Sequence, residues 1–181
     1  QGYGFDITNG GVKETPEKWD LALYLASNCH NPSVQNVLST LQKLKNDKKP
    51  IELDQLSKDL DVPGDLRTRM EVMSNVERKG TRVGGKLSNK DVEFLTGGWL
   101  EYFVFQLLKA YEGKGIWDLN FRMHLKEGGD TPNSINEWDV TFMRDQMLCI
   151  VECKTGEQEH DPKGNDTLYK IEATKSQLSA I

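Results

Sequence analysis

The sequence predicts a two-part protein of mixed helix and strand, with a small helical domain over residues 1–90 and an α+β or α/β core over residues 91–181. In the first part, helix-capping residues are followed by apolar residues at helical spacing. In the second part, successive apolar runs alternate with polar residues in the way that strands do. With 36% hydrophobic and 28% charged residues, the composition is that of an ordinary globular chain with a buried core.

The composition also argues against some classes of protein. No apolar run approaches the length of a membrane span, so we expect a soluble protein without a membrane partner. The 3 cysteines lack CxxC spacing, which disfavours a disulfide framework or a structural zinc site. A reducing compartment, the cytoplasm, is therefore the expected location.

Helices separated by short turns are predicted in the first part. Residues 15–17 combine an N-cap hydroxyl with a proline at the first helical position, and residues 31–32 open a second helix in the same way. Residues 51–60 and 66–76 then read as helix, tight turn, helix, before a glycine-rich stretch at 80–86 that we expect to form a hairpin. Such an order resembles a winged helix, with a plain helical bundle as the alternative.

Charge is unevenly distributed along the chain. Residues 1–90 carry 14 basic against 12 acidic side chains, whereas residues 91–181 carry 9 against 16. Residues 64–90 hold 7 basic side chains against 3 acidic ones. A local basic patch can bind nucleic acid on an acidic protein, and a solvated helix face is the other interpretation. The candidates for phosphate contact are Arg67, Arg69, Arg78 and Arg82.

The second part is expected to contain a helix, three strands and another helix. Residues 99–111 form an apolar helix, predicted to be buried, that carries Glu101 near its start. The strands are expected at 116–126, 135–143 and 147–155, and the final helix at 167–181.

Two of these strands are predicted to bring acids and a lysine together. A symmetric hairpin loop around residues 144–147 places Asp139 opposite Glu152 and Glu137 opposite Lys154. Facing carboxylates repel each other unless a cation lies between them, and two hard oxygen donors suit Mg²⁺ or Mn²⁺. The lysine could then hold a phosphate oxygen or an attacking water. A surface hairpin with an ordinary ion pair is the alternative, and a loop of odd length would favour it.

The acid-x-lysine triplet is specific only in this context. It occurs five times, and only the triplet at 152–154 ends an apolar strand opposite another acid; the triplets lie at 47–49, 77–79, 112–114, 152–154 and 161–163. Four segments in order resemble the PD-(D/E)xK nuclease domain of CRISPR-associated effectors that also carry a CARF sensor domain. They are FLTGGWLEYFVFQLL (94–108), NEWDV (136–140), CIVECKTG (149–156) and DTLYKIE (166–172).

This resemblance implies a restriction-endonuclease-like core and a set of roles. Asp139 and Glu152 would be ligands of Mn²⁺ or Mg²⁺ together with the backbone carbonyl of Cys153, Lys154 would be the catalytic lysine, and Glu101 would complete the site. Members of this family cut DNA, and some cut RNA, when the sensor binds a cyclic oligoadenylate. We expect that sensor to lie outside these residues, and the last strand of the superfamily core has no counterpart before Ile181.

Two other functions remain open at this point. One is a stand-alone restriction or repair endonuclease of the same superfamily, and the other is a non-catalytic winged-helix module that binds DNA. The sequence leaves open whether one or two metal ions take part, whether DNA or RNA is cut, and whether the chain forms a homodimer.

Overall fold

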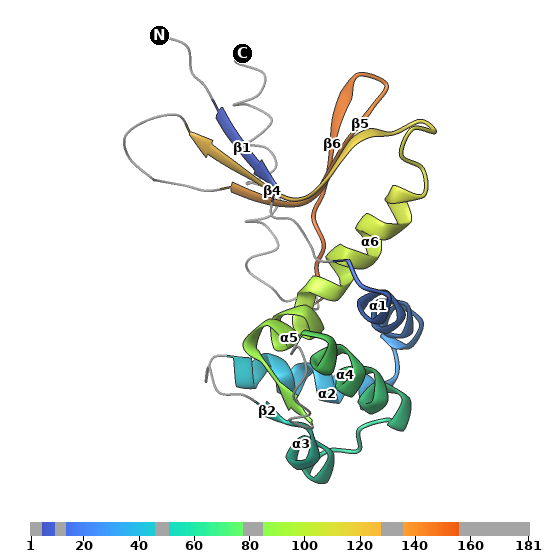
Figure 1. Ribbon diagram of the computed structural model, residues 1–181, viewed down its shortest axis with the longest axis vertical. Helices are drawn as coiled ribbons and strands as arrows, with labels where there is room; N and C mark the ends of the chain where they lie inside the picture. The colour runs from blue at the N-terminus through green and yellow to red at the C-terminus, as the bar shows by residue number, and fades with distance from the viewer. Residues whose placement is uncertain (1–4, 10–13, 46–50, 78–84, 128–135, 156–181) are drawn as a thin grey trace.

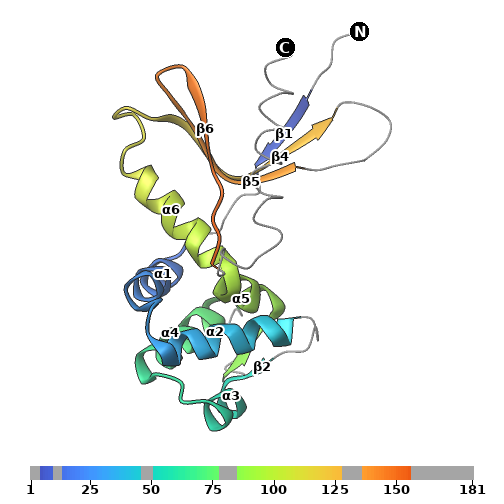
Figure 2. The same ribbon diagram turned by 180° about the vertical axis from the view of Figure 1, so that it is seen from behind.

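Helices and a sheet occupy opposite ends of the molecule, and the helix α6 runs between them (Figure 1). Both views show this arrangement, the second from behind (Figure 2). The structure is a computed structural model that describes residues 5–9, 14–45, 51–77, 85–127 and 136–155. The elements are β1 (Phe5–Asn9), α1 (Pro16–Asn28), α2 (Pro32–Leu44), β2 (Ile51–Glu52), α3 (Leu53–Asp59), α4 (Gly64–Glu77), β3 (Lys86–Leu87), α5 (Asn89–Glu93), the π-helix η2 (Phe94–Gly98), α6 (Trp99–Lys109), β4 (Trp117–Glu127), β5 (Asn136–Arg144) and β6 (Met147–Val151).

The helical end follows its local sequence signals closely. The Thr15 hydroxyl caps α1 by accepting a hydrogen bond from the backbone N–H of Lys18 at 3.3 Å, and Asn31 caps α2 through Ser33 at 2.9 Å. The helix expected from residue 51 begins instead at Leu53. Residues 51–52 form β2 because they pair with β3, which withdraws their backbone from the helix. Most of the expected hairpin at 80–86 lies outside the described residues.

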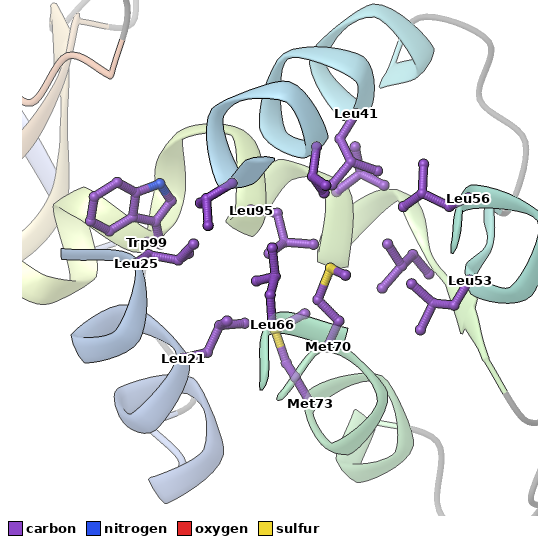
Figure 3. Close-up of a cluster of buried hydrophobic side chains, with 14 residues drawn as sticks. Leu21, Leu25, Leu41, Leu53, Leu56, Leu66, Met70, Met73, Leu95 and Trp99 are labelled. Carbon is purple, nitrogen blue, oxygen red and sulfur yellow. The ribbon is translucent and has the colours of Figure 1, made fainter. Parts of the chain in front are cut away.

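A single apolar core holds the helical end together (Figure 3). Leucines and methionines of α1 to α4 fill it, and Leu95 of η2 and Trp99 of α6 pack into the same cluster. Packing therefore continues across the boundary between residues 90 and 91. The fully or almost fully buried members include Leu21, Leu25, Leu41, Leu53, Leu66, Met70, Met73 and Leu95.

Among the described residues, four strands form an antiparallel sheet in the order β1-β4-β5-β6. The strands expected at 116–126 and 135–143 are confirmed to within a residue at each end. The third expected strand ends at Val151 and not at residue 155. Strand β1 has no counterpart in the sequence prediction, and it pairs along β4 from Phe5 opposite Glu127 to Asn9 opposite Met123.

Helix α6 packs on the sheet and on α1 and is buried only in part, at Trp99 and Tyr102, so the prediction of a buried helix holds only for part of its surface. Phe105 meets Phe121 of β4 edge to face at 5.3 Å between ring centroids, and Phe103 stacks on Trp19 of α1 at 5.8 Å. Near the C-terminal end of the helix, Leu107 is 47% exposed. The helix expected at 167–181 lies outside the described residues. Within the described part of the chain, no helix has the length and apolar character needed to cross a membrane.

Candidate functional site

A two-residue turn sets the register of the β5–β6 hairpin. Asp145 and Gln146 both adopt left-handed backbone angles, with φ of 49° and 65°, as a type I′ turn requires. Arg144 pairs with Met147, and the ladder continues to Val140 opposite Val151. The symmetric loop that the sequence analysis required is therefore confirmed.

Asp139 lies where this ladder ends, at the level of Glu152. Its carboxylate oxygen Oδ2 accepts a hydrogen bond of 2.7 Å from the backbone N–H of Cys153, and the residue is only 9% exposed. This bond draws the chain after Val151 toward β5 and takes the place of further strand pairing. The pKa of Asp139 is raised to about 6, chiefly by burial; the charges of Glu101 and Glu152 act in the same direction, and the backbone hydrogen bond from Cys153 and the charge of Lys154 act against it.

Glu152 and Lys154 form an ion pair beside this carboxylate. The Lys154 ammonium lies 2.7 Å from Oε1 of Glu152, whose side chain is 10% exposed. Burial by itself would lower the pKa of Lys154, but the bond to Glu152 and the charges of Glu152, Asp139 and Glu101 outweigh burial and raise it. Lys154 therefore stays charged and balances part of the acid cluster.

Glu101 approaches the same place from the first turn of α6, as the resemblance implied. Its carboxylate acts electrostatically on Asp139, Cys153 and Lys154. The side chain is 16% exposed and accepts a hydrogen bond of 2.7 Å from Nε of Arg122. Sequence reasoning missed Arg122, because nothing in its neighbourhood marks it off from other polar strand residues.

Glu137 does not face Lys154 in the described ladder, since β6 ends at Val151. It pairs instead across β5 and β4 with His124, and its Oε1 lies 3.9 Å from Nε of Arg122. Cys153 contributes its backbone, because burial, together with the charges of the nearby carboxylates, raises the pKa of its thiol to about 12. A thiol of this kind is no nucleophile.

The chemistry of these donors fits a hard divalent cation. In the part of the chain that the structure describes, no three His, Cys, Asp or Glu side chains already converge on one point as metal ligands. Two largely buried carboxylates and a backbone carbonyl are nevertheless the oxygen donors that Mg²⁺ or Mn²⁺ prefers. The buried charge of Asp139, whose acid neighbours disfavour it, is of the kind that a cation would offset.

Two of the arginines predicted to contact phosphates, Arg67 and Arg69, lie on α4, which is distant in sequence from the acids and the lysine of the site. Arg67 forms ion pairs with Asp54 and with Glu71, the latter at 2.9 Å. Arg69 lies 2.9 Å from a carboxylate oxygen of Asp20 and over the ring of Tyr24 at 4.7 Å. Arg78 and Arg82 lie outside the described residues.

Comparisons with known proteins bear on the family and on the fold. The family model of the Card1-like endonuclease domain matches residues 88–181, about half of the chain. No curated protein sequence matches the chain significantly. The fold is similar to that of Can2 from Sulfobacillus thermosulfidooxidans in complex with cyclic tetra-adenylate, with a TM-score of 0.61, 21% identity and coverage of 95% of this chain and 42% of Can2. It is also similar to the crystal structure of protein VC1899 from Vibrio cholerae, with a TM-score of 0.62, 22% identity and coverage of 94% and 45%. The chain thus spans less than half of either structure.

Proposed function

The chain belongs to the Card1-like endonuclease domain family, and we propose that it is a divalent-metal-dependent endonuclease that hydrolyses phosphodiester bonds in nucleic acid. The observation that supports this most is the buried carboxylate of Asp139 beside the Glu152–Lys154 ion pair. Charges of this kind are costly at the end of a packed sheet, and a metal-assisted hydrolysis needs them there.

The proposal assigns a role to each side chain. A divalent cation, Mn²⁺ or Mg²⁺, would be held by Asp139, Glu152 and the backbone carbonyl of Cys153. When bound, it would activate water as a Lewis acid and offset negative charge on the scissile phosphate. Lys154, held by Glu152, presents a positive charge to phosphate oxygens as they gain negative charge in the transition state. Glu101 adds a carboxylate from α6 and completes the acid cluster.

We further propose that α6, β4, β5 and β6 form a restriction-endonuclease-like core. The support is the order of helix and strands, the packing of α6 on one face of the sheet, and the acids at adjacent strand ends. The mixed α/β architecture itself is shared with the two structures described above.

The helical end would bind the nucleic acid as a winged helix. The order α2, β2, α3, α4, β3 supports this, because β2 before the helix pair joins β3 after it. The cations proposed to contact phosphates are Arg67, Arg69, Arg78 and Arg82. Arg67 and Arg69 would exchange their present acid partners for phosphates on binding.

We place this nuclease in a CRISPR antiviral effector that a cyclic oligoadenylate activates. The support is the family together with the likeness to Can2, which was solved with cyclic tetra-adenylate. The activator would bind a sensor domain elsewhere in a longer protein, and the substrate would be DNA or single-stranded RNA.

The test is single-turnover cleavage in Mn²⁺ of single-stranded DNA, supercoiled plasmid and single-stranded RNA. Lys154→Ala should lower the rate by about 10²-fold or more, the effect of removing one positioned charge or donor in an active site. Glu152→Ala should lose both metal binding and cleavage. The assay includes any upstream sensor with its activator.

Another acid-x-lysine triplet provides the control, because Glu112 and Lys114 sit on the exposed connection after α6. Glu112→Ala and Lys114→Ala should cut like the parent. Cleavage by Lys154→Ala as fast as by the parent on every substrate would refute the role of Lys154.

A further inference from the structure

Arg122, next to the proposed site, has an unusual backbone conformation. It is a long side chain with φ of 47°, a left-handed angle that non-glycine residues seldom adopt inside a strand. Strain of this kind persists where the surrounding structure requires it, often at functional sites. Arg122 is thus a residue whose backbone conformation calls for a physical reason.

The register shows what this conformation achieves. Phe121 and Met123 pair with Val140 and Trp138, so the backbone of Arg122 lies level with Asp139. In a regular strand, consecutive side chains point to opposite faces of the sheet. The left-handed angle breaks that alternation, and both Phe121 and Arg122 contact α6, through Phe105 and Glu101 respectively.

A row of charges therefore crosses the sheet. Arg122 of β4 is level with Asp139 of β5, and Glu152 follows directly after the last residue pair of β5 and β6. Glu101 lies against this row from α6, bound to Arg122 at 2.7 Å. The guanidinium also lies over the ring of Phe121, 5.4 Å from its centroid, which limits its freedom to move away.

The π-helix before α6 leaves space for this guanidinium. A Cβ added at Gly98 would lie 3.0 Å from Nη2 of Arg122, whereas one added at the adjacent Gly97 would meet no atom within 4 Å. Of the two glycines of η2, Gly98 is therefore the one at which an added side chain would press on the guanidinium of Arg122. π-helical turns of this kind are frequent at functional sites.

We propose that Arg122 is a positioning residue that holds Glu101 beside Asp139 and Glu152 and offsets one acid charge, so that the site binds one divalent cation tightly and resists a second. The inference rests on the proposed function. Four acids, Glu101, Glu137, Asp139 and Glu152, set against Arg122 and Lys154 leave a formal charge of −2, and loss of Arg122 would make it −3. An added negative charge close to a divalent ion strengthens binding, by about tenfold for a solvated site.

The experiment is a titration of the 181-residue chain with Mn²⁺ alone, followed by electron paramagnetic resonance of the free ion. The parent should bind one Mn²⁺ tightly. Arg122→Met should bind that ion about tenfold more tightly and take up a second at higher concentration. Arg122→Lys keeps the charge and should titrate like the parent. Single-turnover cleavage by Arg122→Met should fall even at saturating Mn²⁺, because Glu101 is no longer held.

Substitutions at Gly97 and Gly98 test the same idea while leaving every charged side chain of the site in place. Gly98→Ala should shift the Mn²⁺ titration in the direction of Arg122→Met, and Gly97→Ala should superimpose on the parent. Identical titrations of Arg122→Met and the parent would overturn the inference, as would identical titrations of Arg122→Gln and the parent if Arg122→Met fails to fold. A parent that binds no Mn²⁺ would instead overturn the proposed function.

Discussion

The core of the helical end is filled mainly by apolar side chains, whereas the end of the sheet at β5 and β6 gathers Asp139, Glu152 and Lys154 against a helix that carries Glu101. In the first region each of these apolar side chains gains free energy by leaving water. In the second, three acids disfavour one another, and burial raises the pKa of Asp139 to about 6. We therefore expect stability to come mainly from the helical core, and the proposed site at the sheet end to give up stability in order to keep its charges together.

A truncation in the helical core should produce the largest change in stability. Leu25 of α1 is fully buried and Leu23 of the same helix is 40% exposed. Leu25→Ala should lower the free energy of unfolding by about 2–5 kcal/mol, since a cavity is left among close-packed neighbours. Leu23→Ala should lower it by less than about 1 kcal/mol. Chemical denaturation monitored by circular dichroism measures both, and equal losses would show that this core is not the source of stability.

A substitution at the sheet end should act in the opposite direction. Asp139→Asn removes a charge that burial and two acids disfavour, while its side-chain oxygen can still accept the hydrogen bond from Cys153. We expect the metal-free chain at pH 8 to gain about 1–2 kcal/mol of stability. Thermal unfolding in a chelator measures this gain. A variant less stable than the parent would mean that the carboxylate holds the sheet together, and the contrast between the two regions would fail.

The same variant should lose its response to metal. If Mn²⁺ binds the folded chain as proposed, it stabilises the parent, and the melting temperature should rise with Mn²⁺ concentration. Asp139→Asn should abolish the rise because a ligand charge is gone. An equal rise in both proteins would place the cation away from Asp139.

The sequence could predict those features that are encoded locally. Thr15 and Asn31 cap their helices through neighbours two or three residues away, and the loop around Asp145 fixes the register that brings Asp139 level with Glu152. The alternation of side chains along each strand then decides which residues share a face of the sheet. The acids and the lysine of the candidate site were accessible for this reason.

Features that depend on partners distant in the chain could not be predicted in this way. The pairing of β1 with β4 and of β2 with β3 joins segments separated by more than 30 residues, and short runs such as residues 51–52 carry no signal of it. Arg122 acquires its role from a left-handed angle and from Glu101 of another element. The partial exposure of α6 likewise depends on which elements pack against it, and the composition of the helix does not give these.

The smallest effect is expected where the helical end would meet nucleic acid, at Arg67 and Arg69 of α4. Each arginine that contacts a phosphate releases about one counterion, so each Arg→Ala should flatten the plot of log affinity against log salt by about one unit. Between 50 and 200 mM salt that unit corresponds to roughly three- to fourfold in affinity. Fluorescence anisotropy of labelled DNA in a chelator measures the slope without cleavage.

Ion pairs within the chain separate this contact from a merely structural role. Arg69 also lies over Tyr24 and forms an ion pair with Asp20, so Arg69→Ala should lower the stability of the fold as well as flatten the salt dependence of binding. Asp54 is 78% exposed at its side chain and competes with phosphate for Arg67. Asp54→Ala should therefore strengthen DNA binding slightly while leaving the fold intact, because exposed ion pairs contribute at most about 1 kcal/mol. If both arginine variants keep the parent slope and Asp54→Ala binds no more tightly, α4 serves only the core beneath it.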